Sequence, residues 1–170
     1  TRVMNSGRIS GGDYSNATVN NYRTITGGTF GKLHLYSNFA RVQGEEDSVP
    51  TINGPIENVD GGQILQPCHF GAGASVTKNN GTIEVVVTVD GEEKTVNYKA
   101  DILEALGASP TGLWYRVNAD GTRALVKEGE VFASLQGETY TSQVLLPAPK
   151  IEIDYRNESW SVTLTEEEVP

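Results

Sequence analysis

Few residues of this 170-residue chain could carry covalent or metal chemistry. Its single cysteine, Cys68, stands next to one of its two histidines, His69. Such a pair could supply a nucleophile with its base, or two metal ligands. However, neighbouring residues on a strand point to opposite faces, and a structural Zn²⁺ needs about four ligands. We therefore predict no catalytic residue, no metal site and no cofactor, and a single cysteine excludes an internal disulfide.

Acidic side chains are more numerous, and Glu45, Glu46 and Asp47 follow one another directly. A cluster of oxygen ligands could bind Ca²⁺, and a pair of carboxylates in a groove could hydrolyse a glycosidic bond. We interpret this run as a solvated loop, and the chain as not an enzyme. A carbohydrate-active enzyme remains the alternative class, because solenoids with long grooves do carry such activity.

Aromatic side chains offer a third kind of chemistry, which is binding without catalysis. Exposed tyrosine and tryptophan rings stack on sugar rings and on protein partners. The candidate ligand-binding residues are Tyr36, Trp114, Tyr115 and Trp160. For each of them the alternative is a place in the core, because a small β domain needs large residues inside.

The charge distribution limits the partners. The formal net charge is −9, yet residues 1–44 hold five basic side chains against one acidic side chain, Asp13. Nucleic-acid binding requires a basic surface, so we predict no nucleic-acid partner. No stretch approaches the ~20 apolar residues of a membrane helix, so we also predict no membrane insertion in this segment. The oligomeric state is left open.

The elements that position these candidate residues contain a sequence repeat. The hexad Ile9–Tyr14 returns as Ile25–Phe30, and the form apolar-x-Gly-Gly-x-apolar recurs at Val59–Ile64. A period of 16–17 residues rich in Gly, Asn and Thr predicts a β-solenoid whose inward side chains stack in ladders. We expect about four rungs, with glycine pairs at the corners. The predicted ladders are Ile9, Ile25, Val42 and Val59; Tyr22, Phe39 and Ile56; and Tyr14, Phe30 and Ile64.

The segment Thr18–Phe30, TVNNYRTITGGTF, resembles the tandem repeats of Gram-positive (Firmicutes) surface proteins. Those repeats run as variants of G-T-I-x-G-G-T-F and T-V-x-N-x-G-x-I. The resemblance covers residues 1–66, although the third rung has lost its glycine pair. It implies an adhesin-like or stalk-like solenoid outside the cell, either secreted or attached to the cell wall.

A different pattern begins at Gly81. Alternating residues predict strands over 83–89 and 93–98 around the turn Asp90–Gly91, then a short helix within 100–109. Further strands are expected over 113–117, 123–126, 128–135 and 139–146. The segment resembles the β-grasp fold of small ubiquitin-like sulfur carriers and of modules in bacterial surface proteins. It ends in LLPAPK rather than in Gly-Gly, so the resemblance implies the fold without the sulfur chemistry.

The sequence thus predicts a mainly β chain with three parts: a solenoid over residues 1–75, a β-grasp-like α+β domain over 82–146, and a proline-marked segment over 147–170. The last part is either a linker that opens a further module or an edge strand of the preceding sheet. We expect a piece of a bacterial cell-surface protein that acts as a stalk or display element, or that adheres to a glycan or a host protein. A phage or bacterial fibre tip is the other alternative.

Overall fold

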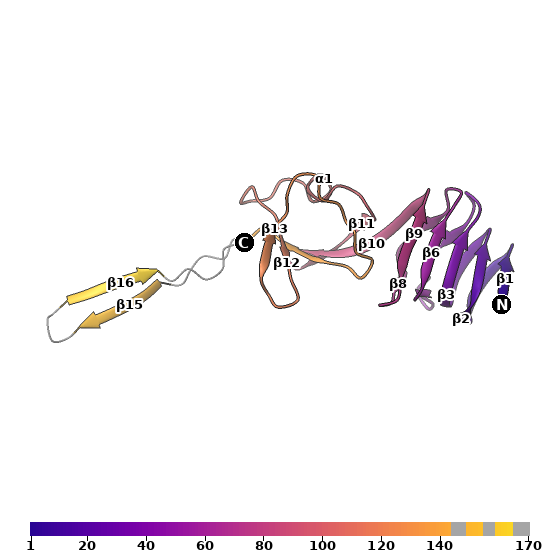
Figure 1. Ribbon diagram of the computed structural model, residues 1–170, viewed down its shortest axis with the longest axis horizontal. Helices are drawn as coiled ribbons and strands as arrows, with labels where there is room; N and C mark the ends of the chain where they lie inside the picture. The colour runs from indigo at the N-terminus through magenta and orange to yellow at the C-terminus, as the bar shows by residue number, and fades with distance from the viewer. Residues whose placement is uncertain (144–148, 155–158, 165–170) are drawn as a thin grey trace.

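The computed structural model describes residues 1–143, 149–154 and 159–164, and it is almost entirely β (Figure 1). Only one short helix, α1 (Ile102–Leu106), interrupts the strands in this described part. The strands that stack in the N-terminal part are β1 (Arg2–Asn5), β2 (Arg8–Asn21), β3 (Thr24–Leu35), β4 (Arg41–Val42), β5 (Thr51–Ile52), β6 (Pro55–Asn58), β7 (Gln63–Ile64), β8 (His69–Phe70) and β9 (Ser75–Asn79).

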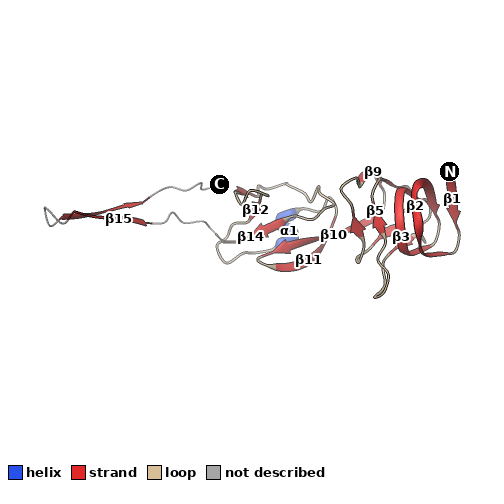
Figure 2. Cartoon of the chain, turned by 90° about the horizontal axis from the view of Figure 1, so that it is seen from below, coloured by secondary structure: helices blue, strands red, loops and turns tan. Residues whose placement is uncertain are grey.

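The N-terminal part is a parallel β-solenoid of about five turns. Each rung pairs in parallel with the one before it, so that β1 lies on β2, β2 on β3, and β3 on the split rung β4–β5–β6. The next rung, β7–β8–β9, pairs in the same way with β4, β5 and β6. Figures 1 and 2 show the rungs stacked from the N-terminus toward the middle of the chain.

Three apolar ladders fill the solenoid, because residues of the same register face inward in every rung. The first ladder confirms Ile9, Ile25 and Val42, but its next member is Ile64 rather than Val59. The rung between them is longer than the period predicts, because the loop Gly44–Pro50 is inserted in it. Val59 is therefore displaced to a half-buried position beside Leu35, whose carbonyl accepts a hydrogen bond from the Val59 amide at 2.9 Å.

The other two ladders differ from prediction in their members. Tyr14 and Phe30 do stack, with ring centroids 5.3 Å apart and planes 7° from parallel, as the sequence predicts. Their ladder continues through Ile52 and Phe70, because Ile64 belongs to the first ladder. The third ladder contains Val3, Val19, Leu33, Ile56 and Val76.

The predicted row of Tyr22, Phe39 and Ile56 is wrong. Tyr22 follows the buried Asn21 at a corner and is half-buried, and Phe39 is 65% exposed. Only Ile56 lies in the core. A period counted along the chain cannot separate an inward position from a corner when the loops between strands differ in length.

Glycines shape the second rung and the third. Gly12 and Gly28 have φ angles of +105° and +101°, which β-carbon-bearing residues rarely adopt. The pairing of β2 with β3 shifts register on either side of Gly11 and Gly12. The predicted glycine pairs therefore act as bends within long strands.

The next five strands form a second unit over residues 82–143. They are β10 (Thr82–Val89), β11 (Glu92–Asn97), β12 (Tyr115–Val117), β13 (Arg123–Leu125) and β14 (Thr139–Thr141). Their order across the sheet is β11-β10-β14-β12-β13, with β10 and β14 parallel and the other pairs antiparallel. Asp101 caps the N-terminus of the helix α1, because its side chain accepts a hydrogen bond from the Glu104 amide. The predicted strand over 128–135 is reduced to one bridge between Val131 and Asp101.

One strand, β10, belongs to both units. Its first residues pair in parallel with β7, and Ile83 caps the first ladder of the solenoid. Farther along, Val85 and Val87 are buried in the second unit, where β10 pairs with β11 and β14. A hairpin of β15 (Pro149–Asp154) and β16 (Ser159–Leu164) follows, paired antiparallel. The rest of the proline-marked segment lies outside the described residues.

Candidate functional site

The strongest candidate site lies at one corner of the solenoid, where the chain leaves β2 and β3. Because β2 and β3 stack, the residues that follow them lie one above the other. The Tyr36 amide donates to the Asn21 carbonyl at 3.1 Å, which places Tyr36 beside Tyr22. The Arg41 amide in turn donates to the Arg23 carbonyl at 2.7 Å, and residues 36–39 form a loop between these two bonds. We call Tyr22, Arg23, Tyr36 and Phe39 the aromatic corner.

The aromatic corner contains a pair of tyrosine rings and an exposed phenylalanine ring beside an arginine. The Tyr22 and Tyr36 ring centroids lie 5.8 Å apart with their planes tilted by 31°, and both side chains are half-buried. The Arg23 guanidinium carbon lies 5.2 Å from the centre of the Phe39 ring, which is within cation–π range. A turn fixes Phe39, because its amide donates to the Ser37 hydroxyl at 3.0 Å and the Ala40 amide donates to the Ser37 carbonyl at 3.0 Å.

A row of polar residues runs beside the aromatic corner on the outer face of the solenoid. Adjacent residues on a strand face opposite sides, so His34 points outward between the fully buried Leu33 and Leu35. The same register in the rungs on either side holds Asn20 and Glu57, and Lys78 follows in the last rung. Lys78 borders a shallow hollow that Tyr98 and Lys99 also line.

His34 connects the row to the corner. Its Nδ1 lies 3.0 Å from the Tyr36 hydroxyl, and its Nε2 lies 3.3 Å from a carboxylate oxygen of Glu57. The hydrogen bond between Nδ1 and the Tyr36 hydroxyl has either group as its donor, according to which ring nitrogen carries the proton. The imidazole also meets the Tyr36 ring edge-on, with centroids 5.5 Å apart. Tyr36 is thereby held in one orientation.

The charge of His34 follows from its burial. Desolvation lowers the pKa of the imidazole below its ordinary value of 6.5, and the positive charges of Lys32 and Arg2 lower it further, although the Glu57 carboxylate opposes them. At neutral pH the ring is therefore uncharged. The site presents flat apolar rings beside hydrogen-bonding groups, which is the combination that recognises a polar ligand with an apolar face.

The four predicted ligand-binding residues are not brought together. Tyr36 lies in the aromatic corner. Trp114 and Tyr115 are 7% and 4% exposed in the second unit, and the Trp114 indole donates to the Gly107 carbonyl at 2.8 Å. Their rings are not accessible to a ligand, so we leave them out of the site. Trp160 lies in β16, and its side chain is outside the described part.

Sequence reasoning missed Tyr22, Phe39 and His34 as site residues. The repeat spacing assigns Tyr22 and Phe39 to the core, where the structure does not place them. One feature of the sequence could have indicated Tyr22. It follows the triplet Val19–Asn21, as Tyr36 follows the triplet Leu33–Leu35, and the two triplets are buried and pair with each other in register.

The residues with covalent or metal chemistry do not form a site in the described part of the chain. Burial raises the pKa of the Cys68 thiol to about 12, so it is a protonated thiol at neutral pH. His69 is exposed beside it. In the acidic loop, Glu45 pairs with Arg8 at 2.6 Å while Glu46 and Asp47 are solvated, as the sequence predicts. No group of three or more His, Cys, Asp or Glu side chains among the described residues is arranged to hold a metal ion.

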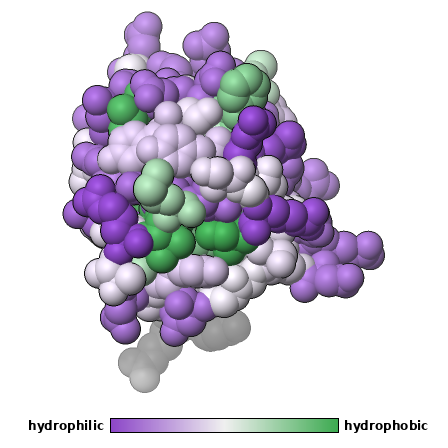
Figure 3. Space-filling model, turned by 90° about the vertical axis from the view of Figure 1, so that its right-hand side faces the viewer, coloured by the Kyte–Doolittle hydropathy of each residue, from purple (hydrophilic) through white to green (hydrophobic). Residues whose placement is uncertain are grey.

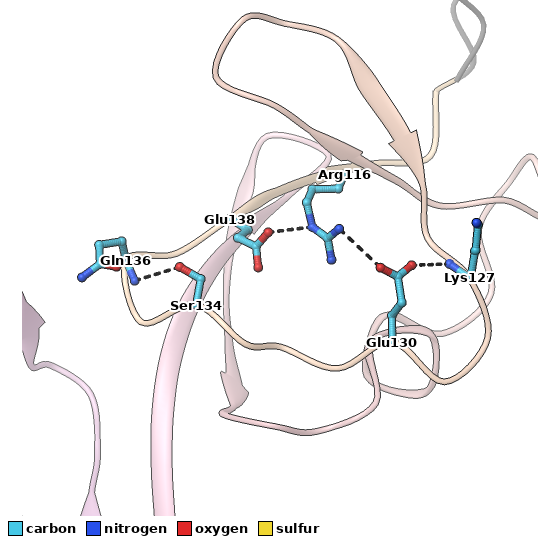
Figure 4. A network of polar contacts seen from close by, with 6 residues as sticks. All are labelled: Arg116, Lys127, Glu130, Ser134, Gln136 and Glu138. Atoms are coloured by element: carbon cyan, nitrogen blue, oxygen red, sulfur yellow. Dashed lines mark hydrogen bonds and ion pairs between the residues drawn. The ribbon is translucent and has the colours of Figure 1, made fainter. Parts of the chain in front are cut away.

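The second unit contains a different polar cluster around Arg116 of β12 (Figure 4). The Arg116 Nε lies 2.6 Å from Glu138 and its Nη1 lies 3.4 Å from Glu130, whose other oxygen accepts from the Lys127 amide. The guanidinium carbon also lies 5.8 Å from the centre of the buried Tyr140 ring. Burial, together with the Glu138 charge, raises the pKa of Tyr140 to about 12. This cluster joins β12, β14 and the turn at Lys127–Glu130, which is a structural role.

The fold and this geometry stand without a matching relative. No protein family, curated protein or solved structure matches the chain. Within the described residues, no helix has the length and apolar character needed to cross a bilayer.

Proposed function

We propose that this chain is a non-catalytic module of a bacterial cell-surface protein, which displays a binding surface on a rigid solenoid and adheres to a glycan through the aromatic corner. The observation that carries this proposal is the half-buried Tyr22–Tyr36 pair, with the exposed Phe39 ring against the neighbouring Arg23, on the outside of the stack. Large aromatic rings are normally buried in a small β domain, so their exposure at one corner supports a recognition surface.

A solenoid suits display because its side faces repeat at a fixed spacing. Each rung hydrogen-bonds to the next through parallel strands, and β10 passes from the last rung into the sheet of the second unit without an intervening linker. A continuous strand resists bending at the junction more than a flexible linker would. The resemblance of residues 1–66 to repeats of Gram-positive surface proteins supports a location outside the cell.

The β-grasp-like assignment of the second unit is part of the same proposal. Its support is the strand order β11-β10-β14-β12-β13, in which β10 and β14, the first and last strands of the unit, pair in parallel. The short helix α1 lies between the two hairpins in the chain, as the sequence resemblance predicts.

A glycan fits the corner because sugars combine an apolar ring face with many hydroxyl groups. The tyrosine rings can stack on the apolar face, while the exposed Arg23 and the partly exposed Glu57 supply a donor and an acceptor on the same side. The basic residues of this face, Lys32 and Lys78, would further favour sugars that carry a carboxylate.

A glycan array tests the proposal. The intact chain should bind a defined set of glycans, and Phe39→Ala and Tyr36→Ala should each weaken binding on the order of tenfold. Leu113→Ala is the matched control, because Leu113 is an exposed apolar residue in the other unit. Background binding to all neutral and acidic glycans, or equal losses in the control, would contradict adhesion through this corner.

A further inference from the structure

The loop Gly44–Pro50, which lengthens one rung of the solenoid, forms a hollow with the outer face of the stack. Seen end-on, the rim of the solenoid carries mostly hydrophilic side chains (Figure 3). The hollow measures about 260 Å³ and is lined by polar residues and one glycine, which are Thr24, Thr26, Arg41, Gln43, Gly44 and Glu45. Drug-sized ligands take pockets of roughly 300–1,000 Å³, so this hollow has room for a part of a ligand, such as one sugar residue.

We propose that this hollow binds the carboxylate of an acidic sugar residue, with Arg41 as its ion-pair partner and the Thr26 hydroxyl as a further hydrogen-bond donor. The inference rests on the glycan adhesion proposed above, because it names the class of sugar that this surface takes. The hollow begins where the aromatic corner ends, since Thr24 follows Arg23 in the chain and the Arg41 amide donates to the Arg23 carbonyl. One glycan can therefore contact both.

The guanidinium of Arg41 is held in one orientation, although the residue is exposed. Its Nε donates to Gln43 Oε1 at 3.1 Å, and its Nη2 donates to the same oxygen. Gln43 is fixed in turn, because its Nε2 donates to the Gln66 carbonyl of the next rung at 2.9 Å. These bonds use one edge of the guanidinium and leave Nη1 and one hydrogen of Nη2 for another acceptor. Two parallel N–H groups of this kind bind a carboxylate at both of its oxygens.

The charges around the hollow leave one position for an external carboxylate. Arg8, Thr24 and Arg41 lie side by side on successive rungs, because Arg8 pairs with Thr24 and Thr24 with Arg41. The loop supplies Glu45, whose carboxylate lies 2.6 Å from Arg8 Nη2. No ion pair in the described part of the chain includes Arg41. The loop thus neutralises one of the two arginines, and a ligand carboxylate would neutralise the other.

The hollow also contains a hydroxyl group without a partner. Thr26 is only 5% exposed, and its buried Oγ1 has no hydrogen-bond partner in the described residues. Thr26 is the extra residue of a β-bulge, because its neighbours Ile25 and Gly27 pair with two consecutive residues of β2. Bulges re-aim side chains, and a buried hydroxyl that lacks a partner costs free energy. A ligand oxygen in the hollow would accept the Thr26 proton and remove this cost.

The loop that walls the hollow is anchored before any ligand binds. The Gly44 amide donates to the Pro67 carbonyl at 2.8 Å, and the Ser48 hydroxyl donates to the Ser10 carbonyl at 3.1 Å. The loop is therefore tied to rungs on both sides of its own. A site whose walls are already fixed loses little conformational freedom on binding.

Oligosaccharides of galacturonic acid and of glucuronic acid test the inference, with their fully methyl-esterified forms as matched neutral probes. Isothermal titration calorimetry on the intact chain should show at least one acid binding on the order of tenfold more tightly than its ester, because the ester cannot pair with Arg41. The same acid should shift the NMR signals of the Thr26, Gln43 and Gly44 amides.

No binding of either acid, equal affinities for acid and ester, or shifts confined to residues outside the hollow would overturn the inference. Displacement of the bound acid by acetate or inorganic phosphate at the same concentration would indicate a general anion site, which would overturn it as well.

Substitutions assign the preference to individual residues. Arg41→Gln should abolish the preference for the acid, whereas Arg2→Gln removes the same charge from an exposed arginine outside the hollow and should retain it. Thr26→Val keeps the shape of the side chain and should weaken acid binding without lowering the urea midpoint, because the hydroxyl has no partner to lose. An intact acid preference in Arg41→Gln, or an equal loss in Arg2→Gln, would overturn the inference.

Failure of this inference is distinguishable from failure of adhesion through the aromatic corner. Tyr36→Ala and Phe39→Ala should weaken the binding of acid and ester alike, whereas Arg41→Gln should weaken the binding of the acid alone. Binding of both probes at the corner without an acid preference would overturn the inference and leave the adhesion standing. Undiminished acid binding in both corner variants would overturn the role of the corner and leave the hollow standing.

Discussion

The two units of this protein differ in how far their aromatic side chains are buried. In the second unit Trp114, Tyr115, Phe132 and Tyr140 are all buried, and the last two rings meet edge-on with centroids 5.8 Å apart. In the solenoid, Phe30 and Phe70 are buried, but Tyr22 and Tyr36 are half-buried and Phe39 is exposed. A stack of narrow rungs has room inside for one side chain per register, whereas the less regular core of the second unit accommodates large residues from several directions.

The polar residues of the two units differ as well. The solenoid buries neutral amides that bond to one another and to the backbone, as Asn5, Asn21 and Asn58 do. The second unit uses charged groups at partly exposed positions, where Arg116 pairs with Glu130 and Glu138. Burying an amide costs less than burying a charge when every donor is used, so a dry, regular interior favours asparagine.

Loss of a ladder ring should produce the largest effect. Phe30→Ala should lower the free energy of unfolding by about 3–5 kcal/mol, since it removes a fully buried ring and leaves a cavity. Urea denaturation followed by circular dichroism measures this loss. Phe132→Ala is the counterpart in the second unit and should cost a similar amount. A loss below about 1 kcal/mol for Phe30→Ala would show that the packing of this ladder contributes little to the stability of the solenoid.

The asparagine pair gives the next largest effect. Asn21→Ala should cost about 2 kcal/mol, because the Asn5 amide and the Arg23 backbone lose buried hydrogen-bond partners. The neighbouring Asn20→Ala is a matched control, since Asn20 is also buried but its Oδ1 has no partner in the described part of the chain. Thermal or urea unfolding compares the two. Equal losses would mean that the asparagine bonds contribute nothing specific.

Removing the charge pairs of Arg116 in the second unit should lower the free energy of unfolding by a smaller amount. Arg116→Met should lower the free energy of unfolding by about 1–2 kcal/mol, because Glu138 and Glu130 lose a partner that is itself partly buried. Arg8→Met removes an exposed pair with Glu45 in the solenoid and should change stability by less than about 1 kcal/mol. A larger effect at Arg8 than at Arg116, measured by the same unfolding assay, would reverse this ranking.

The smallest expected effect is a pH dependence of the solenoid. The pKa of His34 is lowered in the folded state, so the unfolded chain binds the extra proton first as pH falls below about 6.5. The free energy of unfolding should therefore decrease from that pH downward until the folded state is protonated too, and should recover above it. His34→Gln should flatten the slope in this window, whereas His69→Gln at an exposed position should not. Melting temperatures across pH 4.5–7.5 measure the slope, with the window estimated from the ordinary histidine value of about 6.5.

Much of the solenoid could be predicted from the sequence, because stacked rungs require the same residue type at the same register. Ile9 with Ile25 and Tyr14 with Phe30 are recognisable as pairs from their spacing and residue type alone. The prediction failed at Val59 and Phe39, where loops of unequal length break the count between strands. The candidate site was predicted only at Tyr36. Tyr22 comes from the preceding rung, so its proximity to Tyr36 depends on how the two rungs stack. His34 and Phe39 are close to Tyr36 in sequence, but their orientation depends on where the strand ends and the turn begins.

The sequence by itself determined the mainly β character, the parallel repeat and the residue types of two ladders, because a period of 16–17 residues with paired glycines leaves few other ways to bury its apolar residues. Only the tertiary structure decided which aromatic rings face outward and which strand joins the two units. Those outcomes depend on the lengths of the inserted loops and on where β10 leaves the last rung. Neither leaves a periodic signal in the chain, because each is set by contacts between residues far apart in sequence.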